Sequence, residues 1–439
     1  MLAYYFNLAL RSFRRNMVLT TLMVLTIAVG IGATMTTLTL YMVLSGDPIP
    51  HKSSQLFYPR MEPRPASVNE TPDTDPPDML SRYDAEELLR QKHGDRQALL
   101  ASGTLTVIPG DGQSIQPFEA HALYTSADFF PMFEAPLQSG RTWTELEDES
   151  RARVAVIGPG LAHTLFRGED PIGREIHMPE GTLQVIGVLE DWPLNPRFYN
   201  TGRTNRNFGG MEDVFMPFST SRDLGLGGRG GSMCWGTSKD EEGNLGLTAP
   251  CVWMQYWVEL DSAEKADDYL RYLTDYSEQQ RAAGRFEHPT NVRLDNVMGW
   301  LDHNRIVPND VRLQMWLAFG FLLVCLVNTV GLLLAKFLRR SGEIGVRRAL
   351  GASRSAIFTQ CLAEAGVIGL VGGLLGTGMA AAGLWLIRQQ PDDYASLAYM
   401  DGRTLALTFL LALAASLLAG LLPAWRAMQV PPALQLKSQ

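Results

Sequence analysis

The sequence predicts an α-helical membrane protein with four transmembrane helices and a large α+β extracytoplasmic domain of two subdomains. Two observations support this prediction. Four segments without any charged side chain are each long enough to cross a bilayer, which needs about 20 apolar residues per helix. The polar block at residues 47–312 combines strand-like and helix-like patterns, and it is long enough to bury cores of its own.

The charge distribution predicts the orientation in the membrane. Residues 47–312 carry 25 basic and 41 acidic side chains, a balance of −16, whereas the whole chain has a net charge of −8. The short segment at residues 336–364 has six basic side chains and two acidic ones. Short loops rich in Lys and Arg stay in the cytoplasm. We therefore expect both termini and residues 336–364 inside, and residues 47–312 and 388–403 outside.

The elements follow one another in a simple order. The chain divides into a cytoplasmic amphipathic helix (1–15), a first transmembrane helix (16–46), the extracytoplasmic domain with a helical stalk at its C-terminal end (47–312), a second transmembrane helix (313–335), a cytoplasmic segment (336–364), a third transmembrane helix (365–387), a short outer loop (388–403), a fourth transmembrane helix (404–425) and a cytoplasmic tail (426–439).

The first two elements each leave an alternative open. Apolar residues at helical spacing, with arginines on the other side, predict that residues 1–15 lie on the membrane surface, although they could simply extend the first crossing. The uncharged run at residues 16–46 is longer than the apolar core of a cleaved signal peptide, which is about 7–15 residues. We therefore favour a retained anchor.

The extracytoplasmic block begins with a proline-rich segment, residues 59–77, that we expect to be a loop. A capping box at Ser81 predicts a helix that ends near Gly94, and a second amphipathic helix is predicted at residues 263–284. Strands are predicted at residues 98–108, 118–123, 153–157, 183–189, 252–260 and 290–294.

The four cysteines divide by compartment. Cys234 and Cys251 lie in the exported block, where an oxidising environment allows a disulfide that would contribute about 3 kcal/mol. Two free thiols are the alternative. Cys325 and Cys361 lie in or beside predicted membrane helices.

Small residues in the third crossing predict close helix packing. Gly369 and Gly373, and likewise Gly372 and Gly376, have the four-residue spacing typical of helix contacts in membranes. Asn328 is a polar residue inside the second crossing, and we expect its amide to bond to a neighbouring helix. Packing is a better explanation for Asn328 than a transport site.

Several chemistries are absent from the sequence. None of the six lysines follows a glycine, so the chain contains no P-loop. The G-x-G-x-x-G at residues 225–230 lies in the exported block and opens no predicted helix, which argues against a dinucleotide site. The seven histidines have no metal-ligand spacing. The acidic balance of the exported block would repel nucleic acid. The four uncharged runs instead make the lipid bilayer an expected partner.

Residues 324–353 resemble the signature of FtsX-type permeases of MacB-like ABC transporters. The resemblance rests on Val324 to Val330 and on Glu343 to Ser353, and it continues in the Leu-Pro-Ala-Trp-Arg-Ala motif at residues 422–427. The exported block is similar to the MacB periplasmic core domain at residues 127–130, 140–141, 154–158, 170–173 and 185–188. This similarity implies a porter-like subdomain with an inserted lobe.

The resemblance also implies how this membrane protein is driven. MacB carries its ATPase ahead of the first crossing, whereas this sequence starts at the membrane. We therefore expect a separate cytosolic ABC ATPase dimer that binds ATP and Mg, and a transport subunit that is not itself an enzyme and has no cofactor. A second permease copy or a sibling permease would complete a dimer. The residues expected to couple to the ATPase are Glu343, Ile344, Arg347, Arg348, Gly351 and Ala352.

The implied function is export of a hydrophobic or amphipathic substrate from the bacterial inner membrane, driven by movement of the periplasmic domain. A membrane-fusion adaptor and an outer-membrane channel are further candidate partners. A lipoprotein-releasing permease and a mechanotransmitting protein that activates an extracytoplasmic partner are the alternatives. The glycine-rich, cysteine-closed loop at residues 222–251 matches no motif of the family and is either a specificity element or an insertion, and we expect its glycine-rich part at residues 225–232 to be flexible.

Overall fold

The computed structural model describes residues 17–68, 75–110, 116–192, 194–201, 208, 210–390, 398–399 and 402–429. The chain forms two compact units, one of residues 46–306 and one that combines residues 1–45 with 307–439. The helix predicted at residues 1–15 lies outside the described residues, as do most of the loop at 388–403 and most of the tail at 426–439.

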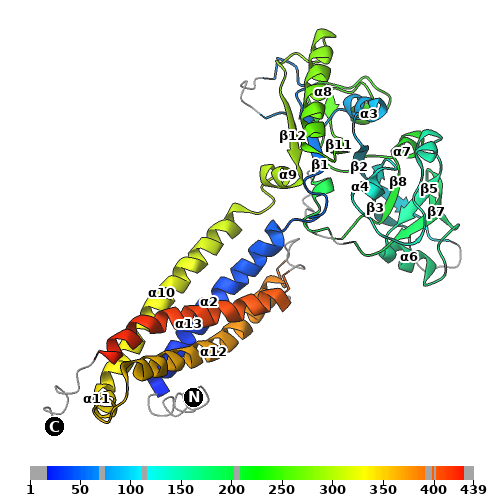
Figure 1. The fold of residues 1–439 in the computed structure, drawn as a ribbon. Helices are drawn as coiled ribbons and strands as arrows, with labels where there is room; N and C mark the ends of the chain where they lie inside the picture. The colour runs from blue at the N-terminus through cyan, green and yellow to red at the C-terminus, as the bar shows by residue number, and fades with distance from the viewer. Residues whose placement is uncertain are drawn as a thin grey trace. The chain divides into compact units, whose positions relative to one another are not determined.

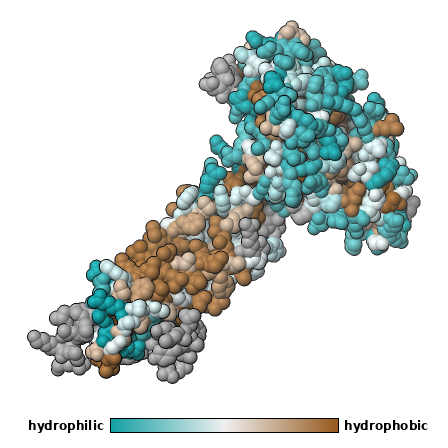
Figure 2. Space-filling view, viewed as in Figure 1, coloured by the Kyte–Doolittle hydropathy of each residue, from teal (hydrophilic) through white to brown (hydrophobic). Residues whose placement is uncertain are grey.

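The unit formed by the two ends of the chain is a bundle of four long helices. They are α2 (Met17–Ser45), α10 (Asn309–Arg339), α12 (Arg354–Ile387) and α13 (Gly402–Met428), and a short helix α11 (Ser341–Ala349) lies between α10 and α12. All four are long and apolar enough to cross a membrane. Each of α2 and α13 packs against both α10 and α12. Hydrophobic side chains cover the visible outer face of this bundle, as suits contact with lipid (Figure 2).

Glycines on α12 allow close contact with two neighbouring helices. A Cβ atom added to Gly372 would lie 2.8 Å from Ile27 on α2, and one added to Gly373 would lie 2.7 Å from Ala412 on α13. Both distances are too short for a real side chain. Gly376 likewise faces α2, whereas Gly369 faces α13. The two glycine pairs therefore serve two different interfaces.

Residues 46–306 are built on one ten-stranded mixed sheet with the strand order β12-β1-β11-β2-β3-β8-β5-β7-β4, in which β6 pairs with β7. The pairs β3–β8 and β5–β7 are parallel. The strands are β1 (Leu56–Met61), β2 (Arg96–Val107), β3 (Phe118–Thr125), β4 (Leu137–Gly140), β5 (Val154–Ile157), β6 (Glu175–Met178), β7 (Gly181–Leu189), β8 (Val214–Pro217), β11 (Gln255–Glu259) and β12 (Val292–Asn296), and a separate hairpin consists of β9 (Met233–Cys234) and β10 (Cys251–Val252).

Helices cover the sheet, and the unit has two lobes (Figure 1). One lobe carries α3 and α8 beside β12, β1 and β11, and the other carries α6 and α7 beside β8, β5 and β7. The sheet runs through both lobes, so the two predicted subdomains share it. The helices and turns are α3 (Arg82–Gln91), α4 (Phe129–Met132), α5 (Glu145–Glu149), α6 (Pro159–Phe166), α7 (Phe218–Asp223), α8 (Ala263–Ala282), α9 (Val297–His303), η1 (Phe198–Asn200) and η2 (Gly243–Leu245).

Strand β1 differs from the predicted proline-rich loop, because it includes Pro59. The strand pairs with β12 as far as Met61 but with β11 only at Leu56 and Phe57. From Tyr58 onward one edge of the strand therefore carries no ladder bonds. Proline is tolerated at such an edge because its missing N–H costs no hydrogen bond.

The Cys234–Cys251 disulfide predicted from the sequence is present and joins the paired strands β9 and β10. The loop that it closes is held against the rest of the unit by side-chain hydrogen bonds. Glu242 in the loop accepts hydrogen bonds from Arg82 at 2.8 Å and from Arg222 at 3.2 Å. The loop is therefore anchored to α3 and α7 by a shared carboxylate.

Asp148 on α5 is a part-buried carboxylate with an unusual environment. Burial is the main cause that raises the pKa of Asp148 to about 7; the nearby negative charges of Asp128 and Glu145 act in the same direction, and the 2.7 Å hydrogen bond donated by the Ala127 N–H opposes them. Its ordinary value is 3.8. The folded state therefore binds this proton more tightly than the unfolded state does.

We expect Asp148→Asn to raise the free energy of unfolding of the unit at residues 46–306 by about 1–2 kcal/mol above pH 7 and to leave it unchanged near pH 4. A raised pKa makes the contribution of Asp148 to stability present below pH 4 and lost as the pH rises from about 4 to 7. Denaturation monitored by tryptophan fluorescence at both pH values measures the difference from wild type. Glu149→Gln is the control, because it removes the same charge from an exposed position of α5. Equal effects of the two substitutions at both pH values would contradict the assignment.

Candidate functional site

Residues 340–353, which include α11, connect α10 to α12. We call this segment the elbow. Helix α11 ends in a left-handed turn at Gly351, where φ is +99°, a conformation that glycine adopts without strain. The N–H of Gly351 donates to Arg348 O at 3.1 Å and the N–H of Ala352 donates to Arg347 O at 3.0 Å, which is the Schellman arrangement. Ser353 caps α12, because its hydroxyl accepts from the Ala356 N–H at 3.2 Å. Both helix ends at the elbow are therefore closed.

A buried ion pair lies next to this elbow. The Lys336 Nζ atom near the end of α10 is 2.5 Å from Glu364 Oε1 on α12, and the two side chains are 0% and 5% exposed. Lys336 also donates to the Thr20 hydroxyl on α2 at 3.3 Å. Charges removed from water are costly unless they are paired, and removing one partner of such a pair costs about 3–5 kcal/mol. The ion pair and the hydrogen bond to Thr20 therefore connect three helices, α10, α12 and α2.

Further charges extend this pair into α11. Arg340 Nη1 lies 3.3 Å from Glu364 Oε2, and Arg340 Nε lies 3.6 Å from Glu343 Oε2. Arg347 Nη2 lies 3.5 Å from the other oxygen of Glu343, and Arg347 Nη1 donates to Gln360 Oε1 on α12 at 3.1 Å. We call the set Lys336, Arg340, Glu343, Arg347, Gln360 and Glu364 the elbow network.

The elbow network surrounds a hollow of about 20 Å³, which is room for one water molecule and not for a nucleotide or another cofactor. Among the described residues, no group of three His, Cys, Asp or Glu side chains is arranged to hold a metal ion. The charges of the elbow network therefore contact one another, and the hollow between them is too small for a nucleotide.

The outer face of the elbow is apolar. Leu350 is 83% exposed and Val346 is 52% exposed, and Ala349 lies between them. Ile344 and Ala352 instead pack against the apolar core of the bundle. Leu350 lies at the end of α11 next to the Gly351 turn, with 83% of its surface exposed in this chain.

The predicted coupling residues thus divide into four groups. Glu343 and Arg347 point into the elbow network, Ile344 and Ala352 pack inward, and Gly351 makes the turn. Arg348 remains part-exposed on α11. Sequence reasoning missed the roles of Lys336, Arg340, Gln360, Glu364, Val346 and Leu350. A signal was available, because Lys336 and Glu364 are the charges that end two uncharged runs on neighbouring helices.

Asn328 lies on the outer face of α10, exposed, and not between helices of this bundle. Among the described residues of this chain, no hydrogen bond of its amide is recorded. Gly320 and Gly331 flank it on α10, and a Cβ atom added to either would meet no atom within 4 Å. Unlike the glycines of α12, these two have no packing role within the chain.

Models of two protein families match most of the chain. The MacB-like periplasmic core domain matches residues 20–276, and the FtsX-like permease C-terminal domain matches residues 315–432. The elbow network and the exposed Leu350 lie within the second of these domains.

Curated relatives agree with the family models. The macrolide export ATP-binding/permease protein MacB of Azoarcus sp. is 27% identical over 310 residues, 69% of this chain and 40% of the relative. The pyoverdine export ATP-binding/permease protein PvdT of Pseudomonas aeruginosa is 26% identical over 325 residues, 73% of this chain and 43% of the relative. The chain thus spans less than half the length of these relatives.

The periplasmic region of MacB from Actinobacillus actinomycetemcomitans is a solved structure with similarity to this chain. It covers 57% of this chain and 92% of its own length, at 15% identity and a TM-score of 0.35. The family models, which together match residues 20–276 and 315–432, decide the assignment. The chain belongs to the MacB/FtsX-type family of ABC transporter permeases, with a MacB-like periplasmic core domain and an FtsX-like permease domain.

Proposed function

We propose that this chain is the permease subunit of an ABC exporter in which a cytosolic ATPase dimer, provided with ATP and Mg, drives movement of the periplasmic domain. One observation carries the proposal: an exposed apolar tip, Val346 and Leu350, stands on an elbow closed at both helix ends and braced by the elbow network. In this proposal both termini and the elbow are cytoplasmic, as the basic charges of residues 336–364 favour.

The proposed transmission runs from the tip to the transmembrane helices. Leu350 docks into the ATPase, while Glu343 and Arg347 hold α11 at a fixed angle to α12. Arg340, Glu364 and Lys336 then pass the movement to α10. Helix α10 begins at Asn309, directly after the unit that ends at Ile306, so the chain itself connects the elbow to the periplasmic domain.

The outer face of α10 is the proposed contact with a second permease copy. An amide facing lipid is costly, and a two-fold symmetric partner would supply the matching amide at Asn328. Gly320 and Gly331 leave space for the close backbone approach that such a pair requires. A dimer of this kind would present two elbows to the two ATPases.

The names of the relatives favour export over lipoprotein release and over signalling. They are described as macrolide and pyoverdine exporters, which supports a hydrophobic or amphipathic cargo for this chain. A membrane-fusion adaptor and an outer-membrane channel would be the partners that carry such a cargo beyond the periplasm.

We expect Leu350→Asp to reduce stimulation of the cognate ATPase at least tenfold and to weaken its binding, because the charge replaces the apolar contact at the tip. The measurement is ATPase activity and co-purification with the reconstituted pair. Leu146→Asp is the matched control, since Leu146 is also exposed (71%) but lies in the periplasmic unit. Coupling at the wild-type level with Leu350→Asp would refute docking at this tip.

Substitutions in the buried ion pair separate stability from transmission. We expect Lys336→Met and Glu364→Leu to lower the stability of the bundle by about 3–5 kcal/mol each, whereas the double variant recovers most of the loss. Resistance to denaturant in detergent measures this cycle. ATPase stimulation should stay low in the double variant, because Arg340 has lost its contact with α12. Recovery of both properties would mean that the pair only stabilises the bundle.

We expect Asn328→Cys to form a disulfide-linked dimer on mild oxidation in membranes, because the two-fold axis would pass close to this position. Non-reducing electrophoresis detects the product. Leu374→Cys, on an exposed position of α12 (60%), is the control and should stay monomeric. Cross-linking of equal efficiency at both positions would count against the α10 interface.

A further inference from the structure

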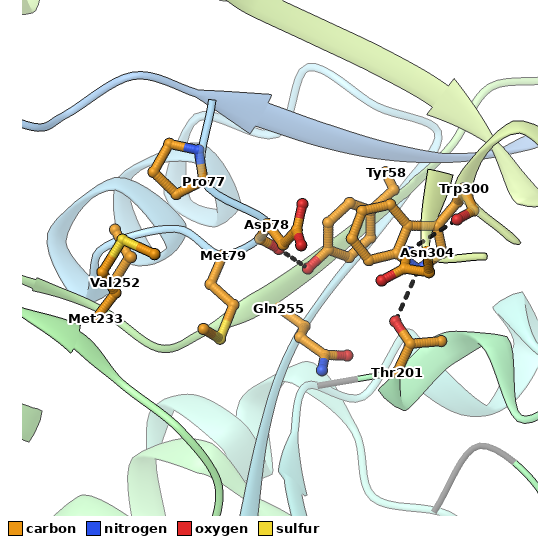
Figure 3. A pocket seen from close by; sticks show the side chains of 10 residues that line it. All are labelled: Tyr58, Pro77, Asp78, Met79, Thr201, Met233, Val252, Gln255, Trp300 and Asn304. Atoms are coloured by element: carbon orange, nitrogen blue, oxygen red, sulfur yellow. Dashed lines mark hydrogen bonds between the residues drawn. The ribbon is translucent and has the colours of Figure 1, made fainter. Parts of the chain in front are cut away.

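The periplasmic unit contains a pocket that the coupling mechanism does not use (Figure 3). Its volume is about 170 Å³, below the roughly 300–1,000 Å³ of sites for drug-sized molecules, so it suits a ligand with a single ring. Side chains from β1, from the segment before α3, from the β9–β10 hairpin, from β11 and from α9 converge on it. The lining residues are Tyr58, Pro77, Asp78, Met79, Thr201, Met233, Val252, Gln255, Trp300 and Asn304.

Apolar, sulfur-containing and aromatic side chains form one part of the pocket wall, and Thr201, Gln255 and Asn304 contribute polar groups to the rest. Met79 and Met233 contribute thioethers, and Figure 3 shows Met79 between the Val252 side and the stacked rings of Tyr58 and Trp300. The two ring centroids are 3.7 Å apart. Thioethers make favourable contacts with aromatic rings. The wall is therefore suited to an aromatic ligand.

Charge on the lining comes from a carboxylate. Of the described residues that line the pocket, only Asp78 is charged, and its side chain is 51% exposed. Arg60 lies 3.5 Å from Asp78, but it directs Nε and Nη2 to Asp295 at 3.2 and 2.8 Å, so one guanidinium faces two carboxylates. His303 Nε2 lies 2.8 Å from Asp78 Oδ1. The half-exposed Asp78 carboxylate therefore shares its nearest guanidinium with Asp295.

We propose that this pocket binds a small aromatic amine, with the ring between the methionines and the ammonium group at Asp78. An ammonium and a carboxylate form a charge-assisted hydrogen bond, which is stronger than a neutral one. The pocket needs no ATPase, so binding can be measured on this chain alone and independently of the coupling mechanism.

The disulfide has a direct role in this pocket. Met233 and Val252, which form one wall, are adjacent in sequence to Cys234 and Cys251 and pair with each other across the hairpin. The bridge therefore holds the wall closed. The loop at residues 222–251, which matches no motif of the family, gains a role as part of a binding site.

The test uses the full chain in phosphatidylcholine nanodiscs with three probes that share a ring and differ in charge: 2-phenylethylamine, 2-phenylethanol and 3-phenylpropionate. Calorimetry, corrected with empty nanodiscs, should give an affinity for the amine at least tenfold above that for the alcohol, and the acid should bind weakest. Asp78→Asn should abolish the preference for the amine, whereas Asp267→Asn on the exposed face of α8 should preserve it.

Two further variants test the wall. Met233→Trp, which fills the pocket from its part-exposed side, and the Cys234→Ser/Cys251→Ser pair should each weaken binding of the amine and of the alcohol at least tenfold. Binding of the amine that survives Asp78→Asn with its preference intact would overturn the proposal. Equal affinity for all three probes, or no binding above that of empty nanodiscs, would overturn it as well.

Discussion

The contact between Lys336 and Glu364 is the constraint on which the membrane-spanning unit depends. Both side chains are almost completely buried among apolar helices, so each charge is tolerable only while the other stays within reach. This requirement ties α10 to α12 at the end where α11 begins, although each of the two helices packs mainly against α2 and α13. Arg340 then shares Glu364 and carries the same constraint into the elbow.

Close packing of α12 against α2 and α13 stabilises the bundle in addition to the ion pair. Gly372 and Gly376 admit α2 to one side of α12, and Gly369 and Gly373 admit α13 to another side. Helices in lipid gain little from hydrophobic burial against one another, so van der Waals contact at small residues has to hold them. The ion pair therefore holds the bundle at one end, and close packing at glycines holds it along its length. Helix α11 begins at the end that carries the ion pair.

The sequence was informative where a pattern is local. The four apolar helices follow from uncharged runs, and helix α8 follows from its apolar stripe. The sheet order could not be predicted, because the parallel partners β3 and β8 are separated by four strands and several helices. Short strands such as β4 and β6 are held by their neighbours and not by propensity.

The same distinction applies to the candidate site. The basic segment and Gly351 could be recognised because charge and glycine are visible residue by residue. The elbow network could not, since Glu364 meets Lys336 only when two helices are folded together. The outward position of Leu350 depends likewise on which face of α11 the network turns inward. Asn328 was expected between helices and lies outside, because the amide faces away from α2 and α13.

The capped turn at Gly351 has a consequence for how force would travel. A frayed helix end absorbs displacement by unwinding, but here the carbonyls of Arg347 and Arg348 are already satisfied and Ser353 closes the next helix. In the proposed coupling mechanism, helix α11, which is nine residues and about 13 Å long, would act as a stiff lever that turns about its end near Arg340. A force applied at Leu350 would then rotate α11 as a rigid body, and little of the movement would be lost to unwinding of the helix end.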